Sequence, residues 1–143
     1  MILEKADKER IIKLADFLQR EVGDFPKFKR LSWKEYQTDN DQRRNIERWV
    51  ENVVNSSIDI AKIILAADKV RIPQTYKDIL HNLGATHYFK DSLARKLSQW
   101  AKLRNIVTHE YLDIRWESIK EFVEESEPVY LEFLKIIKKQ VIK

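Results

Sequence analysis

The fold is decided by residues 46–65, which read IERWVENVVNSSIDIAKIIL. Apolar or small side chains in this run recur at alternating steps of four and three, which is the spacing of one helix face. The positions on that face are Ile46, Val50, Val53, Ser57, Ile60 and Ile64, and Val54, Ala61 and Leu65 widen it. A face this broad is typical of a helix buried in a bundle. The run therefore predicts one long helix that begins near Asp39 or Asp41 and ends before Pro73.

Helical spacing also extends from this helix toward the N-terminus. The segment from Glu4 to Val22 predicts a helix that Gly23 stops. Between this helix and the long one, Ser32 and Glu35 have the spacing of a capping box, which predicts a short helical turn in the connector.

Three further helical segments are predicted toward the C-terminus. Thr75 to Leu83 predicts a short helix that Thr75 caps and Gly84 closes. Thr86 is the predicted cap of the next helix, whose apolar positions are Leu93, Leu97, Trp100, Ala101 and Leu103. Asp113 is the predicted cap of a last helix that reaches Val141 and that Pro128 kinks or restarts.

The composition agrees with a helical chain. With 2 Gly and 3 Pro among 143 residues, few positions favour the tight turns of a hairpin-rich β protein. We therefore expect an all-α fold, an up-and-down helical bundle of four to five main helices, in a single domain over residues 1–143.

Residue types that the sequence lacks exclude several classes of protein. The absence of Cys excludes a disulfide framework, thiol catalysis and thiolate metal sites, and it suits a reducing cytosol. No secretory signal and no apolar run of membrane-spanning length occur, so we expect a cytoplasmic protein without membrane contact. The net charge of +4, with both signs interspersed, permits an RNA partner without demonstrating one.

The segment RNIVTHEY, residues 104–111, carries the candidate chemistry. On a helical wheel of about 100° per residue, Arg104 falls on the apolar face of the preceding helix, and Tyr111 falls there too. Burying an unpaired guanidinium costs several kcal/mol or more, so Arg104 needs an anionic partner, a cleft or a second subunit beside it. For an isolated arginine, a structural pair with a carboxylate would be a sufficient explanation.

His109 is placed differently from Arg104. Five steps along an unbroken helix turn it about 140° away, so the two side chains cannot share a face if the helix continues. Either the helix ends or distorts near Thr108 and lets His109 fold back, or a second subunit completes the pair. Asn105 lies one turn before His109 and could orient its imidazole. A histidine at a helix end is otherwise usually a polar surface group.

This segment resembles the R-x4-H-x-Y signature of HepT-type HEPN proteins. Other segments are similar to the same family, in order along the chain: residues 44–48, 58–61, 72–78 and 100–103. The likeness spans roughly Lys8 to Lys139, nearly the whole chain. The resemblance implies a HEPN-like helical bundle that pairs into a homodimer, with the arginine and histidine lining a cleft at the subunit interface.

The resemblance also implies an activity, the cleavage of RNA without a metal ion or other cofactor. That reaction needs a base for the ribose 2′-hydroxyl, an acid for the leaving 5′-oxygen and a cation for the phosphorane. An imidazole exchanges protons near neutral pH and a guanidinium holds phosphate oxygens bidentately. We therefore expect His109 as acid or base and Arg104 as electrostatic clamp, with Asn105 as a weaker catalytic candidate.

Regulation is implied by the same family. In HepT systems an MntA-like nucleotidyltransferase antitoxin transfers AMP to the tyrosine of the motif, which here is Tyr111. Phosphates added beside Arg104 would occupy the cation and repel RNA. The expected assembly is a homodimer that can join a larger hetero-oligomer with the antitoxin. The alternative function is a non-catalytic subunit that presents substrate or nucleotide to a nucleotidyltransferase.

Several other features have simpler explanations. Lys29, Arg30 and Trp33 interleave basic and aromatic groups as an RNA-binding surface does, but aromatics that cover the end of a bundle look the same in sequence. His81 and His87 lack metal-site spacing and are interpreted as surface residues. Asn52, Asn55 and Asp59 form a polar line on the long helix, either facing the cleft or simply exposed.

Overall fold

The computed structural model describes residues 3–143, and all of its regular structure is helical. The elements in chain order are α1 (Lys5–Val22), α2 (Phe25–Lys29), α3 (Trp33–Thr38), α4 (Asn40–Ala67), α5 (Tyr76–His81), η1 (Asn82–Ala85), α6 (Asp91–Ser98), η2 (Gln99–Lys102), α7 (Leu103–His109), α8 (Leu112–Glu125), α9 (Glu127–Ile136) and η3 (Ile137–Val141). The prediction of an all-α bundle is confirmed.

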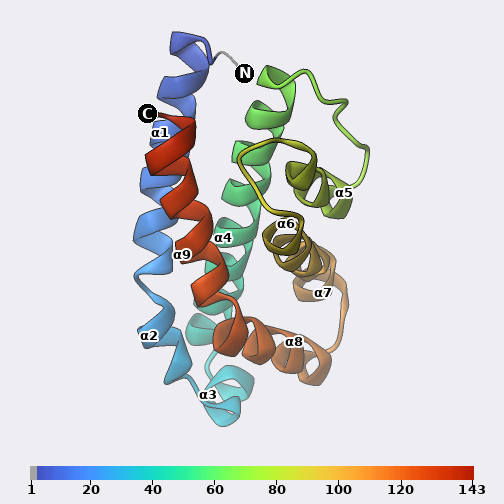
Figure 1. The fold of residues 1–143 in the computed structure, drawn as a ribbon. Coiled ribbons are helices and arrows are strands. Elements are labelled where there is room, and N and C mark those ends of the chain that lie inside the picture. The colour runs from blue at the N-terminus through green and yellow to red at the C-terminus, as the bar shows by residue number, and fades with distance from the viewer. Residues whose placement is uncertain (1–2) are drawn as a thin grey trace.

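The helix α4 is the centre of the bundle (Figure 1). All nine positions that the sequence assigned to its apolar face are buried. α1 packs along α4, α9 lies against α1 and α6, and α5 and α7 also contact α4. α8 crosses the lower end of the bundle, where it contacts α2 and α3 (Figure 1).

Aromatic side chains pack together in the core where α8 meets α2 and α4. Phe122 of α8 packs edge-on against Trp49 of α4 and Trp100 of η2, with ring centroids 5.6 and 5.5 Å apart. Phe25 of α2 meets the same Trp49 at 4.8 Å, and the Trp49 indole N–H donates to the Glu21 carbonyl at 2.7 Å. This cluster ties α8 to α4, and so fixes where the chain goes after the candidate motif.

Most predicted helix ends lie where the sequence placed them. Asp39 caps α4 by accepting from the N–H groups of Asp41 and Gln42, and Thr75 caps α5 by accepting from Asp78. Ser32 and Glu35 form the predicted capping box of α3. α9 begins immediately before Pro128, so this proline restarts the last helix.

Three predicted ends are wrong. The Thr86 hydroxyl donates to the Leu83 carbonyl at 2.7 Å and so closes η1, while α6 begins five residues later at Asp91. Gly84 lies inside the 3₁₀ turn η1 instead of ending a helix. Asp113 lies in the first turn of α8, whose N-cap is Tyr111. None of the helices over residues 3–143 has the length and apolar character needed to cross a bilayer.

Candidate active site around residues 104–111

The motif occupies the end of a helical segment that changes its pitch. α6, the 3₁₀ turn η2 and α7 follow one another without a gap from Asp91 to His109. Leu103 and Val107 of α7 are buried and anchor this helix to the core. Asn105 and His109 are exposed and Arg104 is half-buried, so the motif side chains lie at the surface of a rigidly held helix.

The helix ends directly after His109. Glu110 has extended backbone, with φ −89° and ψ 163°, and Tyr111 is also extended before α8 begins at Leu112. Arg115 holds this turn, because its Nε donates to the Glu110 carbonyl at 2.7 Å and its Nη1 reaches the Glu47 carboxylate at 3.3 Å.

Glu47 joins this turn to the long helix. Its carboxylate also accepts a hydrogen bond from the hydroxyl of Tyr36 on α3. Burial and the contact with Glu47 raise the pKa of the Tyr36 phenol above its ordinary value, so this hydroxyl stays a hydrogen-bond donor. The turn that carries Tyr111 is therefore tied to both α3 and α4.

Arg104 contacts an aromatic ring. Its guanidinium carbon lies 3.9 Å from the ring centre of Tyr76, the first residue of α5, and the Lys62 ammonium lies 5.4 Å from the same centre. A hydrogen bond from Arg104 and its positive charge lower the pKa of the Tyr76 phenol. Within residues 3–143 no carboxylate forms an ion pair with Arg104, so the structural explanation by an Arg–carboxylate pair is not supported.

The two expectations about His109 have different outcomes. α7 ends at His109, one residue after Thr108, so a helix end near Thr108 is present. A return of the His109 side chain toward Arg104 stays a prediction, and the Thr108 hydroxyl donates to the Arg104 carbonyl at 2.9 Å. Asn105 forms no hydrogen bond with His109 in the described chain. Completion of the pair by a second subunit stays a prediction.

The placement of Tyr111 on the apolar face of its helix is wrong. That prediction assumed an unbroken helix over residues 93–111, but the extended backbone at Glu110 interrupts it. The Tyr111 side chain is instead 81% exposed. A tyrosine held in extended backbone beside α7, with its side chain in solvent, is accessible to a modifying enzyme.

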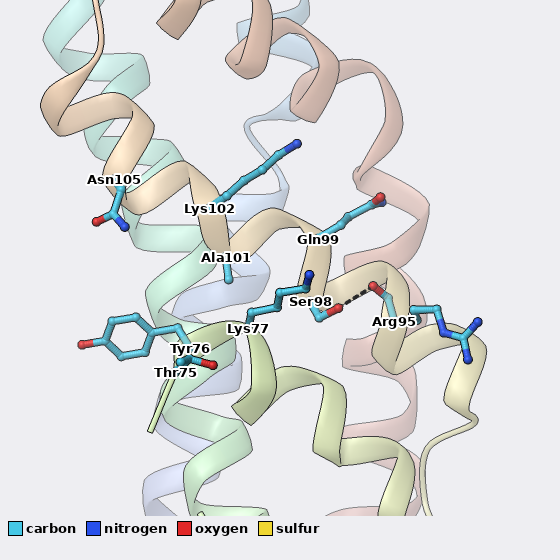
Figure 2. Close-up of a pocket in the computed structure, with 9 residues that line it drawn as sticks. All are labelled: Thr75, Tyr76, Lys77, Arg95, Ser98, Gln99, Ala101, Lys102 and Asn105. Atoms are coloured by element: carbon cyan, nitrogen blue, oxygen red, sulfur yellow. Dashed lines mark hydrogen bonds between the residues drawn. The ribbon is translucent and has the colours of Figure 1, made fainter. Parts of the chain in front are cut away.

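A cleft of about 550 Å³ lies between α5 and the α6–η2–α7 segment (Figure 2). It is lined by Thr75, Tyr76, Lys77, Arg95, Ser98, Gln99, Ala101, Lys102 and Asn105. Asn105 of the motif is part of this wall, and Tyr76, whose ring Arg104 covers, is part of the opposite wall. Tyr76 was not among the site residues expected from the sequence, because nothing in the local pattern pairs α5 with α7.

The remaining candidates lie elsewhere. Lys29 forms an ion pair with Glu127 at 2.8 Å, and the Trp33 ring packs against Trp116 at 6.1 Å. These contacts favour a structural role for the connector, and RNA binding by Lys29, Arg30 and Trp33 stays a prediction. His81 and His87 are exposed, as expected of surface residues.

Two other findings concern polar groups. Asp59 is exposed on α4, and its negative charge partly opposes the lowering of the Tyr76 pKa. The Asn52 amide, in contrast, donates to the Glu21 carboxylate at 3.2 Å. Over residues 3–143 no group of three or more histidine, aspartate or glutamate side chains is arranged to hold a metal ion.

A family model described as HepT-like, Ribonuclease HepT-like, matches residues 8–137. A comparison with curated protein sequences finds no significant match.

Solved structures share the fold at low sequence identity. The tri-AMPylated HEPN toxin of Shewanella oneidensis, in complex with MNT antitoxin, has a TM-score of 0.77 at 20% identity, over 91% of this chain and 97% of that chain. A toxin–antitoxin complex with AMP-PNP has a TM-score of 0.78 at 19% identity, over 91% and 98% of the two chains. A mutant MntA–HpeT toxin–antitoxin complex has a TM-score of 0.77 at 18% identity, with the same coverage.

Proposed function

The chain belongs to the HepT-like ribonuclease family, and on that premise we propose that it is a toxin that cleaves RNA without a metal ion. The observation that carries the proposal is the R-x4-H-x-Y segment itself: α7 presents Arg104 and His109, and Tyr111 follows in an exposed turn. The fold shared with HEPN toxins agrees with this assignment.

In the proposed reaction His109 moves the proton and Arg104 holds the phosphate. The imidazole takes the proton of a ribose 2′-hydroxyl or supplies one to the departing 5′-oxygen. The guanidinium binds the non-bridging oxygens, whose negative charge grows as the 2′-oxygen attacks phosphorus. Asn105, on the cleft side of α7, is the weaker candidate, as a donor to the substrate.

The proposed active unit is a homodimer. Within one α7 helix, five positions on an ideal wheel turn Arg104 and His109 about 140° apart. A second copy that packs its α7 against the first would supply the missing partner. The predicted cleft at the subunit interface follows from this arrangement.

We further propose that an MntA-like nucleotidyltransferase silences the toxin by transferring AMP from ATP to the Tyr111 hydroxyl: the phenol oxygen bonds to the α-phosphorus, loses its proton, and pyrophosphate leaves. The 81% exposure of that side chain supports the proposal, and the similar Shewanella oneidensis toxin is tri-AMPylated and bound to its antitoxin. The added phosphates would place negative charge beside the motif and repel the RNA backbone.

The activity is tested with His109→Ala. Expression of the wild-type chain alone is expected to slow growth, and the purified protein is expected to cleave RNA in the presence of a chelator. The variant should lose both effects, with a fall in rate of about 10²-fold or more. His87→Ala is the matched control, because His87 is also exposed and stacks only on its neighbour Tyr88. Unchanged toxicity of His109→Ala would contradict the proposal.

The regulation is tested by mass spectrometry. Coexpression with a neighbouring nucleotidyltransferase gene is expected to add AMP to the intact chain, and peptide mapping should place it on Tyr111. Tyr111→Phe should remain unmodified and toxic. An AMP group found only on another residue would overturn the assignment of Tyr111.

The alternative function is a non-catalytic partner subunit of a nucleotidyltransferase. It is favoured by the helical spacing of Arg104 and His109, which turns the two side chains about 140° apart within one chain. This alternative predicts a protein that binds the transferase and leaves RNA intact even when Tyr111 is unmodified.

A further inference from the structure

The cleft between α5 and the α6–η2–α7 segment has its own charge and shape. Two of its lining residues, Lys77 and Lys102, are exposed and have no carboxylate partner within residues 3–143. The third cation, Arg95, is paired with Asp91 at 2.5 Å. No carboxylate is among the lining residues, so the cleft presents uncompensated positive charge.

Neutral hydrogen-bonding groups complete the lining. The hydroxyls of Thr75 and Ser98 already form hydrogen bonds within the chain. The Thr75 hydroxyl accepts from the Asp78 N–H, and the Ser98 hydroxyl donates to the Arg95 carbonyl. The carboxamides of Gln99 and Asn105 have no such partner in the described chain. Both are therefore available to a ligand that carries donors and acceptors.

The cleft leads to the motif. Figure 2 shows Lys77 reaching from α5 toward η2, which carries Gln99 and Lys102, with Asn105 one helical turn further along. Beyond Asn105, Arg104 lies against Tyr76, which also lines the cleft. A chain of phosphates that entered beside Lys77 and Lys102 would reach the clamp arginine along this path.

The size of the cleft favours a nucleotide chain over a protein surface. Its volume of about 550 Å³ falls within the range of roughly 300–1,000 Å³ that holds small ligands. A stable protein contact generally needs about 1,000 Å² or more of buried area, with a centre depleted of charge, and the two unpaired lysines of this cleft do not suit such a centre.

We propose that this cleft binds the sugar–phosphate backbone of the RNA substrate next to the cleavage position, with Lys77 and Lys102 as its phosphate contacts. The proposal rests on the proposed ribonuclease function and adds to it the residues that bind the substrate away from the reacting atoms. Such contacts position the strand without reading its sequence.

The test measures RNA binding apart from cleavage. The probe is a fluorescein-labelled 2′-O-methyl RNA oligonucleotide, which lacks the attacking hydroxyl, and its anisotropy is followed between about 50 and about 200 mM salt. The variant Lys77→Gln/Lys102→Gln is expected to bind roughly tenfold more weakly. Its plot of log affinity against log salt should flatten by about 1.4, since each phosphate contact to a single strand contributes about 0.7.

A control of equal charge separates this effect from net charge. Lys90→Gln/Lys96→Gln removes two exposed lysines of the same region that do not line the cleft. This control should keep the wild-type affinity and slope within about twofold. Equal behaviour of the two double variants would overturn the proposal. Self-association of the cleft variant is measured by light scattering. If the variant loses self-association but keeps the wild-type RNA affinity, the proposal is also overturned, and the cleft is then an interface between copies.

Cleavage of ordinary RNA distinguishes this inference from the function on which it rests. The cleft variant is expected to show a raised KM and a kcat near that of the wild type, because its lysines do not touch the reacting atoms. If the wild type cleaves RNA and the variant keeps its KM, the inference fails alone. If the variant loses probe affinity but the wild type never cleaves, the inference holds and the ribonuclease function fails.

Discussion

Arg104 is held at the surface of α7 by the ring of Tyr76 rather than by a carboxylate. A cation over an aromatic face is attracted by the ring without being neutralised, whereas an ion pair would cancel its charge. The guanidinium therefore keeps its positive charge for a phosphate while its position is restricted. Sequence reasoning found Arg104 from its odd place on an apolar face, but its partner is 28 positions earlier in the chain, beyond the reach of helical periodicity.

This contact predicts the titration of Tyr76. Because Arg104 favours the phenolate, the phenol should titrate below its ordinary pKa of 10.0. The Tyr76 phenol therefore adds to the stability of the native state only as the pH rises through its lowered pKa. Near neutral pH it adds nothing. The measurement is the alkaline absorbance of phenolate in the wild type minus that in Tyr76→Phe, which isolates one of the five tyrosines.

The variant Arg104→Met supplies the second half of this test. Removing the guanidinium should move the Tyr76 pKa back up toward 10, although Lys62 still favours the phenolate. Tyr36 and Tyr130 serve as internal references, since burial raises the pKa of both. A Tyr76 that titrates at or above its ordinary value in the wild type would show that Arg104 does not lie against it in solution.

At the scale of elements, the turn between α7 and α8 determines what the motif can do. It ends the helix after His109 and leaves Tyr111 exposed in extended backbone. Amphipathic spacing predicted most helices on either side, because each has a clear buried face and several have side-chain caps. A helix end near Thr108 was one of two alternatives from the sequence, and the pattern could not choose between them because residues 103–111 contain no Gly or Pro. Arg115 stabilises this helix end through a local hydrogen bond to the Glu110 carbonyl and a contact with Glu47, which is distant in sequence.

Arg115→Met is expected to destabilise the fold through this turn. The Arg115 and Glu47 side chains are only 22% and 16% exposed, so the variant leaves a largely buried carboxylate without its cation, with Tyr36 as its remaining donor, and removes the side-chain donor of the Glu110 carbonyl. The free energy of unfolding in urea should fall by about 1–3 kcal/mol. Arg95→Met is the control, because its pair with Asp91 is 72% and 57% exposed and should contribute less than about 1 kcal/mol. Equal losses in the two variants would argue against a specific role for Arg115.

At the scale of the whole molecule, the bundle holds Arg104 and His109 on one helix, where ideal helical spacing turns them about 140° apart. The core fixes α7 through Leu103 and Val107, so unwinding the helix to bring the two side chains together would disturb both anchors. We therefore propose a composite site formed by two chains, each giving one of the two residues. Helical spacing reveals this divergence, but a single chain contains no partner from which to predict the interface.

Complementation between inactive chains tests that proposal. Arg104→Ala and His109→Ala should each be inactive alone. In a mixed dimer, one site would combine the intact Arg104 of one chain with the intact His109 of the other. Random mixing makes half of the dimers mixed, each with one of two sites intact, so about a quarter of wild-type RNA cleavage should return. The pair Arg104→Ala with Arg104→Ala/His109→Ala is the control that cannot form an intact site. If mixing restores no activity although mass spectrometry shows mixed dimers, both residues must act within one chain, and α7 must then change its conformation when it binds RNA.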